Sequence, residues 1–431
     1  MNYRYYAFLS IAMLWISCEG PKSKVDIPSP KKAAYASDTL QLSPEVLYDK
    51  VLGALVGSAI GDAMGAPTEM WHRKNIQLKY GYVTDIEPVV RPESPEGSWA
   101  HHLMAGATTD DTRWKYLTAK YFSAFSTELT PENFAAFIVD YYQSQTKKLK
   151  DASISVAPDS LDVRIEKIDW IKEWARVAIA YGEGPKEYQK AQSRFYGGEM
   201  SCAGQLYTPM FGFVSKTPDD AYQLAYEHAL FDIGYGRDIA ALVSAMTHMA
   251  LRTQNMDSIL NVAAFVDPYG YQDSRLVGRI SYGIAENAIT NVLAIRQEVL
   301  VDSLLKKDAI LFKVPDGFPG SKDEWVRQEK VYQLLEKDEK AIAFHAGEIW
   351  QILITGMQFG QGDFEKTLQF IVNYGRDNDT VAAIAGMILG ARDGYSGLPD
   401  NLKKKVVQVN TENLGIDLEA LAQELTAEIT R

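Results

Sequence analysis

Two short acidic motifs, far apart in the chain, each stand where an amphipathic helix is predicted to begin. The first is Thr109-Asp110-Asp111-Thr112, which precedes apolar residues at helical spacing through Phe125. The second is Asp377-Asn378-Asp379-Thr380, which follows a helix-like run over 363–373 and precedes a small-residue run over 381–391. Neighbouring carboxylates repel one another unless a cation holds them, and Mg²⁺ prefers such oxygen ligands. The pattern leaves two interpretations open: one shared metal site, or two independent helix caps.

Helical periodicity continues through most of the chain. Ser43-Pro44 is a typical helix start, and the apolar run that follows is interrupted by Gly53, Gly57 and Gly61. Each glycine weakens a helix by up to ~1 kcal/mol relative to alanine, so tight packing must compensate. Proline and glycine indicate a long loop over 71–107. We predict further helices over 112–125, 131–145, 165–181, 218–231, 237–251, 256–266, 277–300, 323–336 and 341–357. Strand-like alternation is scarce, and the sequence predicts one all-α domain over 43–431.

The N-terminus has the pattern of an export signal. Residues 1–17 combine one cation with an apolar run too short to span a membrane, and they end next to Cys18. Trp15-Ile16-Ser17-Cys18 resembles a bacterial lipobox, which predicts lipidation of Cys18; the alternative is a first core helix with a chance cysteine. Residues 18–42 are rich in proline, lysine and serine and are predicted to be a disordered tether. We therefore expect an exported, lipid-anchored protein that faces the periplasm or the cell surface.

Charge and cysteine content exclude several classes of function. A net charge of −12 gives no basic field for a nucleic-acid backbone, so no nucleic-acid partner is expected. Two cysteines cannot form a disulfide framework or a cysteine-based zinc site. Contact with a membrane is expected only through the lipid anchor, and the protein is expected to be a monomer.

Two glycine-rich loops between the acidic motifs are candidates for binding a ligand. The loop over 196–209 contains Gly198, Glu199, Gly204 and Tyr207, and its backbone could approach a sugar or phosphate closely. A tight connection between helices explains that loop equally well. The loop over 231–238 adds Asp232 as a weaker candidate.

Three stretches together resemble the ADP-ribosylglycohydrolase family, of the type that activates dinitrogenase reductase. They are Gly53 to Glu69, with Gly61-Asp62-Ala63 and Gly65-Ala66-Pro67 inside it; Thr109 to Thr112; and Gly375 to Thr380 with the Ala/Gly-rich run after it. The resemblance covers about 47–393. It implies a compact all-α bundle of orthogonal helices, a centre of two Mg²⁺ (sometimes Mn²⁺) ions, and hydrolysis at C1 of a ribose.

The resemblance also implies roles for individual residues. Metal ligands would be Thr109, Asp110, Asp111, Asp377, Asp379 and Thr380. Glu69, Asp111 and Asp377 would be catalytic, and Glu69 would also help to shape the substrate site. Asp62 matches a family position, either at the site or as a hydrogen-bonding partner at a helix end. Substrate contacts are expected from Gly198, Glu199, Gly204, Tyr207, Asp232, Arg376 and Asn378.

The chain departs from the family pattern at two places. Arg376 and Asn378 replace a glycine and a small hydroxyl residue, and Arg376 could pair with a substrate anion or with a carboxylate. In the central loop, the family usually has a Gly-Asn-Gly-like start and an arginine shortly before its proline; here the residues are Gln205, Leu206, Tyr207 and Thr208. These differences leave the metal–ribose chemistry in place and the recognition of ADP open. The alternatives are a glycosidase of the same fold acting on another glycan, and a non-catalytic lipoprotein that binds a sugar or nucleotide.

Overall fold

The computed structural model describes residues 42–90, 102–126, 128–151, 158–195, 198–300 and 313–430, with side chains omitted over 151–167 and at 195. Helices account for nearly all of its regular structure, which confirms the all-α prediction. The longer helices are α1 (Pro44–Gly65), α2 (Arg73–Tyr80), α3 (Asp110–Phe125), α4 (Pro131–Asp151), α5 (Pro158–Glu183), α6 (Pro185–Phe195), α8 (Pro218–His228), α9 (Tyr235–Arg252), α12 (Ile280–Gln297), α14 (Lys322–Lys337), α15 (Ala346–Gly360), α16 (Phe364–Tyr374), α17 (Asn378–Asp393), α18 (Asp400–Val409) and α19 (Leu418–Ile429). Shorter helices are α7 (Phe211–Val214), α10 (Met256–Leu260) and α11 (Val262–Phe265).

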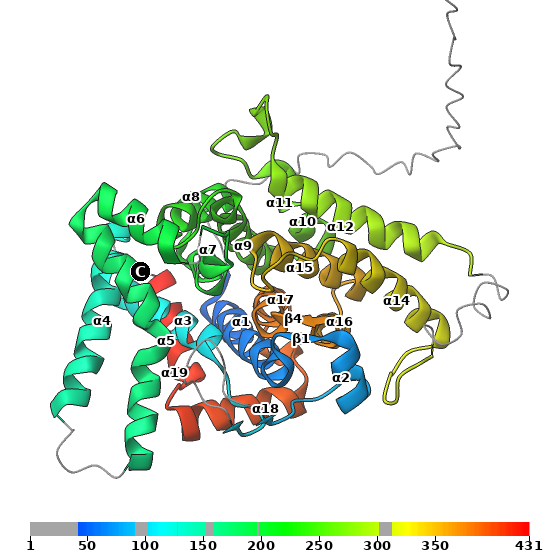
Figure 1. Ribbon diagram of the computed structural model, residues 1–431, viewed down its shortest axis with the longest axis horizontal. Helices are drawn as coiled ribbons and strands as arrows, with labels where there is room; N and C mark the ends of the chain where they lie inside the picture. Colours follow the sequence, from blue (N-terminus) through cyan, green and yellow to red (C-terminus); the bar gives the residue numbers. More distant parts are fainter. Residues whose placement is uncertain are drawn as a thin grey trace, which may run out of the picture. The chain divides into compact units, whose positions relative to one another are not determined.

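Helices α1 and α17 lie side by side at the centre of the fold (Figure 1). Glycines allow this close packing: a Cβ at Gly61 would lie 2.0 Å from the Ala382 carbonyl oxygen, and one at Gly65 would lie 2.3 Å from the Asp379 Cα. Helix α17 is buried almost throughout and α1 is buried from Val51 to its end, so their association removes much apolar surface from water. The glycines that weaken α1 as an isolated helix are therefore required for its packing, and α1 reaches the segment that begins α17.

A two-residue ladder joins the same two regions. Strand β1 (Trp71–His72) pairs antiparallel with β4 (Gly375–Arg376), and the Met70 N–H donates to the Arg376 carbonyl oxygen at 2.7 Å. Gly375 has a φ of +84°, and a Cβ there would lie 2.2 Å from the Trp71 carbonyl oxygen. The ladder holds Glu69 near Asp377, because Asp377 directly follows β4 and Glu69 stands two residues before β1. A second ladder joins β2 (Val89–Val90) to β3 (His102–Leu103).

The structure corrects the prediction of a loop throughout 71–107, because α2 lies within it. Ile76 and Arg73 are the residues of α2 that are buried, so the sequence shows no apolar period there. Arg73 instead forms a bidentate pair with Glu329 of α14, with N–O distances of 2.6 and 2.8 Å, and Nε donates to Glu336 at 2.6 Å. This helix is fixed by long-range ion pairs rather than by an apolar face. The predicted helix over 256–266 is also divided, into α10 and α11.

The predicted signal peptide, Cys18 and the tether lie outside the described residues. Among the residues that are described, no helix combines the length and hydropathy needed to span a bilayer.

Candidate metal centre

Three carboxylates from the two ends of the chain converge in the structure. One oxygen from each of Glu69, Asp377 and Asp379 lies within 4.8 Å of the other two. Asp377 stands at the N-cap position of α17, yet its side chain makes no capping hydrogen bond. Asp377 and Asp379 are 4% and 3% exposed, so neither carboxylate has bulk water to solvate it fully. A helix cap alone does not account for this arrangement.

The motif at 109–112 meets the motif at 377–380 through a direct hydrogen bond. The Thr380 hydroxyl donates to Asp111 Oδ2 at 3.0 Å, which connects α17 to α3. The other oxygen of Asp111 accepts from the Lys115 ammonium at 3.2 Å, one turn further along α3. Lys115 is buried and was not identified from the sequence, where its i+4 spacing from Asp111 was the available signal. The structure thus brings both acidic motifs to one place.

Asp62 of α1 organises the start of α3. Its two oxygens accept from the Thr109 N–H (3.0 Å) and hydroxyl (2.9 Å) and from the Thr112 N–H (3.1 Å) and hydroxyl (2.6 Å). A carboxylate at a helix N-terminus satisfies amides that lack intrahelical partners. Burial, followed by nearby Asp111, raises the pKa of Asp62 to about 7. Of the two roles considered for Asp62, the structure shows the hydrogen-bonding role at a helix end. The Thr109 hydroxyl donates to the Asp62 carboxylate.

The residues at this centre fit divalent cations. Burial, and then the neighbouring Glu69, raises the pKa of Asp377 to about 8 and that of Asp379 well above its ordinary value. Among the residues that the structure describes, no hydrogen-bond partner reaches the buried Asp379 Oδ1. A buried anionic oxygen with no donor is costly, and a hard cation would satisfy it. The converging oxygens are therefore a suitable ligand set for such an ion.

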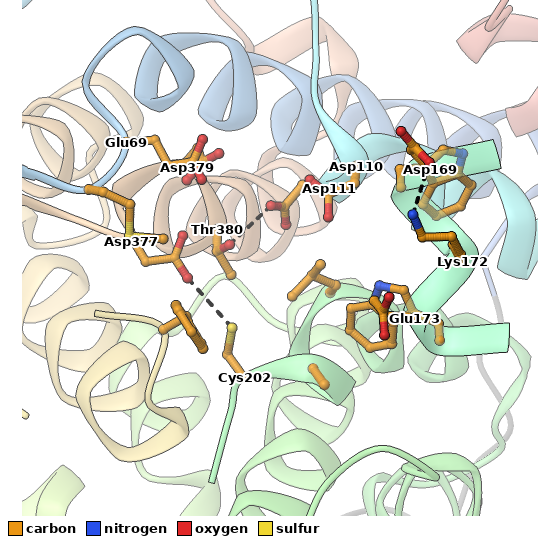
Figure 2. A pocket seen from close by; sticks show the side chains of 16 residues that line it. Glu69, Asp110, Asp111, Asp169, Lys172, Glu173, Cys202, Asp377, Asp379 and Thr380 are labelled. Carbon is orange, nitrogen blue, oxygen red and sulfur yellow. Dashed lines mark hydrogen bonds and ion pairs between the residues drawn. The ribbon is translucent and has the colours of Figure 1, made fainter. Parts of the chain in front are cut away.

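A cavity of about 380 Å³ opens onto the carboxylates (Figure 2). Figure 2 shows Glu69, Asp377 and Asp379 on one side and Asp169, Lys172 and Glu173 of α5 on the other. The lining consists of Glu69, Met70, Asp110, Asp111, Asp169, Trp170, Lys172, Glu173, Trp174, Cys202, Ala203, Leu206, Phe344, Asp377, Asp379 and Thr380. Of the predicted metal ligands, Thr109 is not among these residues.

The two replaced residues of the second motif stabilise the backbone around it. Arg376 has a φ of +64° and forms a bidentate pair with Glu348 of α15, at 2.5 and 3.0 Å. Asn378 is fully buried and donates to the Thr68 hydroxyl (2.8 Å) and to the Val372 carbonyl oxygen (2.9 Å). Both were predicted to contact substrate, and the structure places both in structural contacts outside the lining of the cavity.

The other predicted substrate contacts also lie outside that lining. Gly198 and Glu199 are exposed on the surface. Tyr207 is fully buried among aromatic rings, and its hydroxyl donates to the His228 carbonyl oxygen at 2.8 Å. The Gly204 N–H donates to Asp232 Oδ1 at 2.9 Å, and Asp232 Oδ2 occupies the space that a Cβ of residue 204 would need. Gly204 and Asp232 therefore fix the path of the central loop, while the adjacent Ala203 reaches the cavity.

Burial of Asp232 predicts a specific dependence of stability on pH. Burial raises its pKa to about 7, from an ordinary value of 3.8. Between pH 3.8 and pH 7, Asp232 is protonated in the folded chain and ionised in the unfolded chain. Its contribution to the unfolding free energy therefore falls as pH rises toward 7. The unfolding free energy of the parent protein should fall between pH 5 and pH 8. In Asp232→Asn we expect this fall to be smaller by up to about 3 kcal/mol. Urea denaturation at pH 5 and pH 8 measures the unfolding free energy of each variant. An unchanged pH slope would contradict this, and Asp257→Asn, at an exposed carboxylate, is the control.

Several residues of the cavity were not singled out from the sequence as site residues. The Cys202 thiol donates to Asp377 Oδ2 at 3.5 Å, and burial raises the pKa of the thiol well above its ordinary value. Met70 has a φ of +62° beside Glu69, and Phe344 accepts the Cys202 N–H at its carbonyl oxygen. The wall from α5 gave no motif at all, because its polar and aromatic residues follow an ordinary helical pattern.

Comparison with known proteins agrees with the motifs. The family model described as ADP-ribosylglycohydrolase matches residues 43–431. The chain belongs to this family. The family is metal-dependent and indicates a hydrolase of glycosidic bonds. Family membership was predicted from the three stretches and is confirmed.

Individual relatives are distant. The uncharacterized protein YegU of Escherichia coli (strain K12) is 22% identical over 382 residues, which cover 87% of this chain and 97% of YegU. An uncharacterized protein of Archaeoglobus fulgidus is 22% identical over 347 residues, covering 80% and 88%. A solved structure, titled ADP-ribosylglycohydrolase-related protein complex, matches with a TM-score of 0.50 at 17% identity, covering 89% of this chain and 99% of that one. This last likeness supports the fold alone.

Proposed function

We propose that this protein hydrolyses the bond between C1 of a ribose and its leaving group, in an ADP-ribosyl protein or a related ribosyl glycoside. The observation that carries the proposal is the convergence of Glu69, Asp377 and Asp379 within 4.8 Å at the cavity, with Asp111 joined to Thr380 beside them. Two Mg²⁺ or Mn²⁺ ions would be held by Asp110, Asp111, Asp377, Asp379 and Thr380. Thr109, which directly precedes Asp110, donates its hydroxyl to Asp62.

Each carboxylate has a role in this reaction. Divalent ions supply Lewis-acid activation of water and bind sugar hydroxyls. Glycosidic cleavage develops oxocarbenium-like positive charge at C1, and the carboxylates of Asp111 and Asp377 stabilise it. Glu69 is half-buried at the edge of the cluster and accepts the proton of the attacking water. Hydrogen bonds from Thr380 and Lys115 orient Asp111, and the ladder beside Asp377 orients Glu69.

The direct test offers the full chain a panel of C1 glycosides with Mg²⁺ and then with EDTA. The panel contains ADP-ribosyl-arginine, an ADP-ribosyl-serine peptide and ribosides without phosphate, and the measurement is release of the free sugar. We expect release that requires the metal and is lost with EDTA. If no glycoside is cleaved with Mg²⁺ or Mn²⁺, the proposal is wrong and a protein that only captures its ligand is the better description.

Location is a separate proposal, which rests on the sequence of residues 1–18. We expect lipidation of Cys18 to anchor the protein to the bacterial membrane, facing the periplasm or the outside. Cys18→Ser should move the protein from the membrane fraction to the soluble fraction, as seen by immunoblot of fractionated cells. Cys202→Ser, at the other cysteine, is the control and should leave the distribution unchanged. Retention of Cys18→Ser in the membrane would contradict the proposal.

A further inference from the structure

The carboxylate of Glu348 links two segments that border the metal centre. Glu348 lies in the first turn of α15, is 2% exposed, and stands outside the described lining of the cavity. Its Oε1 accepts from Arg376 Nε at 2.5 Å, and its Oε2 accepts from Arg376 Nη2 at 3.0 Å. Oε2 also accepts the Lys340 N–H, and Arg376 donates to the Lys340 carbonyl oxygen at 2.8 Å. A bidentate pair of this kind fixes the relative orientation of its two groups.

Arg376 has an unusual backbone conformation that depends on its surroundings. Its φ of +64° lies in the left-handed region, where a residue with a Cβ is strained. Glycine adopts the same conformation freely. Here Glu348 holds the far end of the Arg376 side chain, and pairing with β1 holds its backbone. These contacts therefore select a conformation that arginine would seldom adopt alone.

The backbone at Arg376 determines where two carboxylates of the cluster lie. Asp377 follows Arg376 directly, so a rotation of the chain at Arg376 would redirect the Asp377 side chain. The Arg376 carbonyl oxygen also accepts the N–H of Met70, the residue after Glu69, at 2.7 Å. Met70 itself has a φ of +62°. A change in the chain at Arg376 would therefore move both Asp377 and Glu69, which come within 4.8 Å of each other.

The segment between α14 and α15 extends the same support to another wall of the cavity. This segment, over 338–345, is bonded to the ion pair through its backbone and carries Phe344, which lines the cavity. The Phe344 carbonyl oxygen accepts the Cys202 N–H at 2.8 Å. The Cys202 thiol in turn donates to Asp377 Oδ2 at 3.5 Å (Figure 2). Contacts that begin at Glu348 thus reach Asp377 from two directions.

We propose that Glu348 is a positioning residue for the metal centre and that it acts through Arg376. The ion pair holds Asp377 in the orientation that binds a divalent ion with little rearrangement. It also holds Glu69 in the orientation that accepts a proton from the attacking water. Glu348 itself contacts neither the ion nor the substrate. The kinetic part of this inference rests on the proposed function, whereas the part that concerns metal affinity does not.

Glu348→Gln tests the role of the charge. Glutamine keeps an oxygen that can accept the Lys340 N–H, and it leaves Arg376 without its anionic partner. We expect the affinity of the full chain for Mg²⁺, measured by calorimetry, to fall at least fivefold. Unchanged Mg²⁺ affinity would overturn the inference. A parent protein that binds neither Mg²⁺ nor Mn²⁺ would overturn it as well.

Kinetics separates this inference from the proposed function. With a glycoside that the parent cleaves, at saturating Mg²⁺, the kcat of Glu348→Gln should fall at least tenfold while KM changes less than threefold. The reason is that the surface of the cavity is kept while Glu69 is misoriented. If the parent cleaves no glycoside and Glu348→Gln still loses Mg²⁺ affinity, the proposed function fails and the inference stands.

Arg376→Gly distinguishes positioning through Arg376 from a direct effect of Glu348. Because glycine adopts the left-handed conformation without an anchor, Mg²⁺ affinity in this variant should stay within threefold of the parent. Adding Glu348→Gln to Arg376→Gly should then lower the affinity by less than twofold. A further fivefold loss in the double variant would overturn the inference. This comparison remains valid if Glu348→Gln alone does not fold.

Asp238→Asn is the matched control. Asp238 is 1% exposed and accepts from Arg279 Nε at 3.2 Å and Nη2 at 2.8 Å, outside the described lining of the cavity. Loss of this buried bidentate pair should lower the unfolding free energy, measured by urea denaturation, while Mg²⁺ affinity stays within twofold. A fivefold loss of Mg²⁺ affinity in Asp238→Asn would show that any buried ion pair has this effect, and it would overturn the specific role of Glu348.

Discussion

Asp377→Asn is expected to abolish hydrolysis while making the metal-free protein more stable. The substitution keeps the shape of the side chain and removes an oxygen ligand, so activity should fall at least about a hundredfold, with a similar loss of Mg²⁺ affinity. Because burial and Glu69 raise the pKa of Asp377 to about 8, ionising it costs free energy in the folded state. Removing that charge should raise the unfolding free energy at pH 8, in EDTA, by about 1 kcal/mol or more.

The pairing of these two effects is what identifies a metal ligand. Substitution of a residue that only supports the fold would lower both the activity and the stability of the protein. Asp257→Asn, at an exposed carboxylate of α10, is the control and should change neither quantity. Full activity in Asp377→Asn would show that Asp377 is not a ligand of the metal centre. Calorimetric titration with Mg²⁺ and urea denaturation measure the two effects.

Gly65→Ala is expected to weaken the metal centre from a distance. A Cβ at this position would lie 2.3 Å from the Asp379 Cα and 2.4 Å from its nitrogen, so the start of α17 must move. Overpacking of this kind costs about 1–3 kcal/mol of unfolding free energy, and it outweighs the gain of up to ~1 kcal/mol from replacing glycine in a helix. Displacement of Asp379 should lower Mg²⁺ affinity about tenfold or more, because ligand geometry is strict.

Two other glycines separate packing from metal binding. Gly53 lies on the same face of α1, and a Cβ there would lie 2.4 Å from the Gly394 carbonyl carbon, at the far end of α17 from the site. Gly53→Ala should therefore lose similar stability while Mg²⁺ affinity stays within twofold. No described atom lies within 4 Å of a Cβ added at Gly182 of α5, so Gly182→Ala should be neutral or stabilising. Equal Mg²⁺ affinity in Gly65→Ala and Gly53→Ala would contradict the claim that packing at Gly65 positions Asp379 for metal binding.

The helices around the acidic motifs could be predicted because their signals are local. Apolar residues at helical spacing and caps such as Ser43, whose side chain accepts the Val46 N–H, are readable from neighbouring residues. The repeated glycines of α1 also indicated tight packing, although the partner helix could not be named. Helix α2 was missed because ion pairs from Arg73 to residues more than 250 positions away fix it.

The candidate site was predictable in its acidic residues and not in its surroundings. Two carboxylates in one turn are unusual enough to indicate a cation, and Asp62 was conspicuous as a single charge within an apolar run. The wall from α5 and the pairing of Arg376 with Glu348 depend on contacts between distant segments, which no local pattern encodes. The same holds for Tyr207, an aromatic residue in a glycine-rich loop whose ring belongs to the core.

The central claim is that both acidic motifs hold the same pair of metal ions. Crystals of the full chain grown with Mn²⁺ allow the ions to be located by anomalous diffraction. We expect two peaks in the cavity about 4 Å apart, a typical separation in two-metal sites, one in contact with Asp111 and one with Asp377 or Asp379. Peaks confined to surface carboxylates, with the cavity unoccupied at saturating Mn²⁺, would contradict the account.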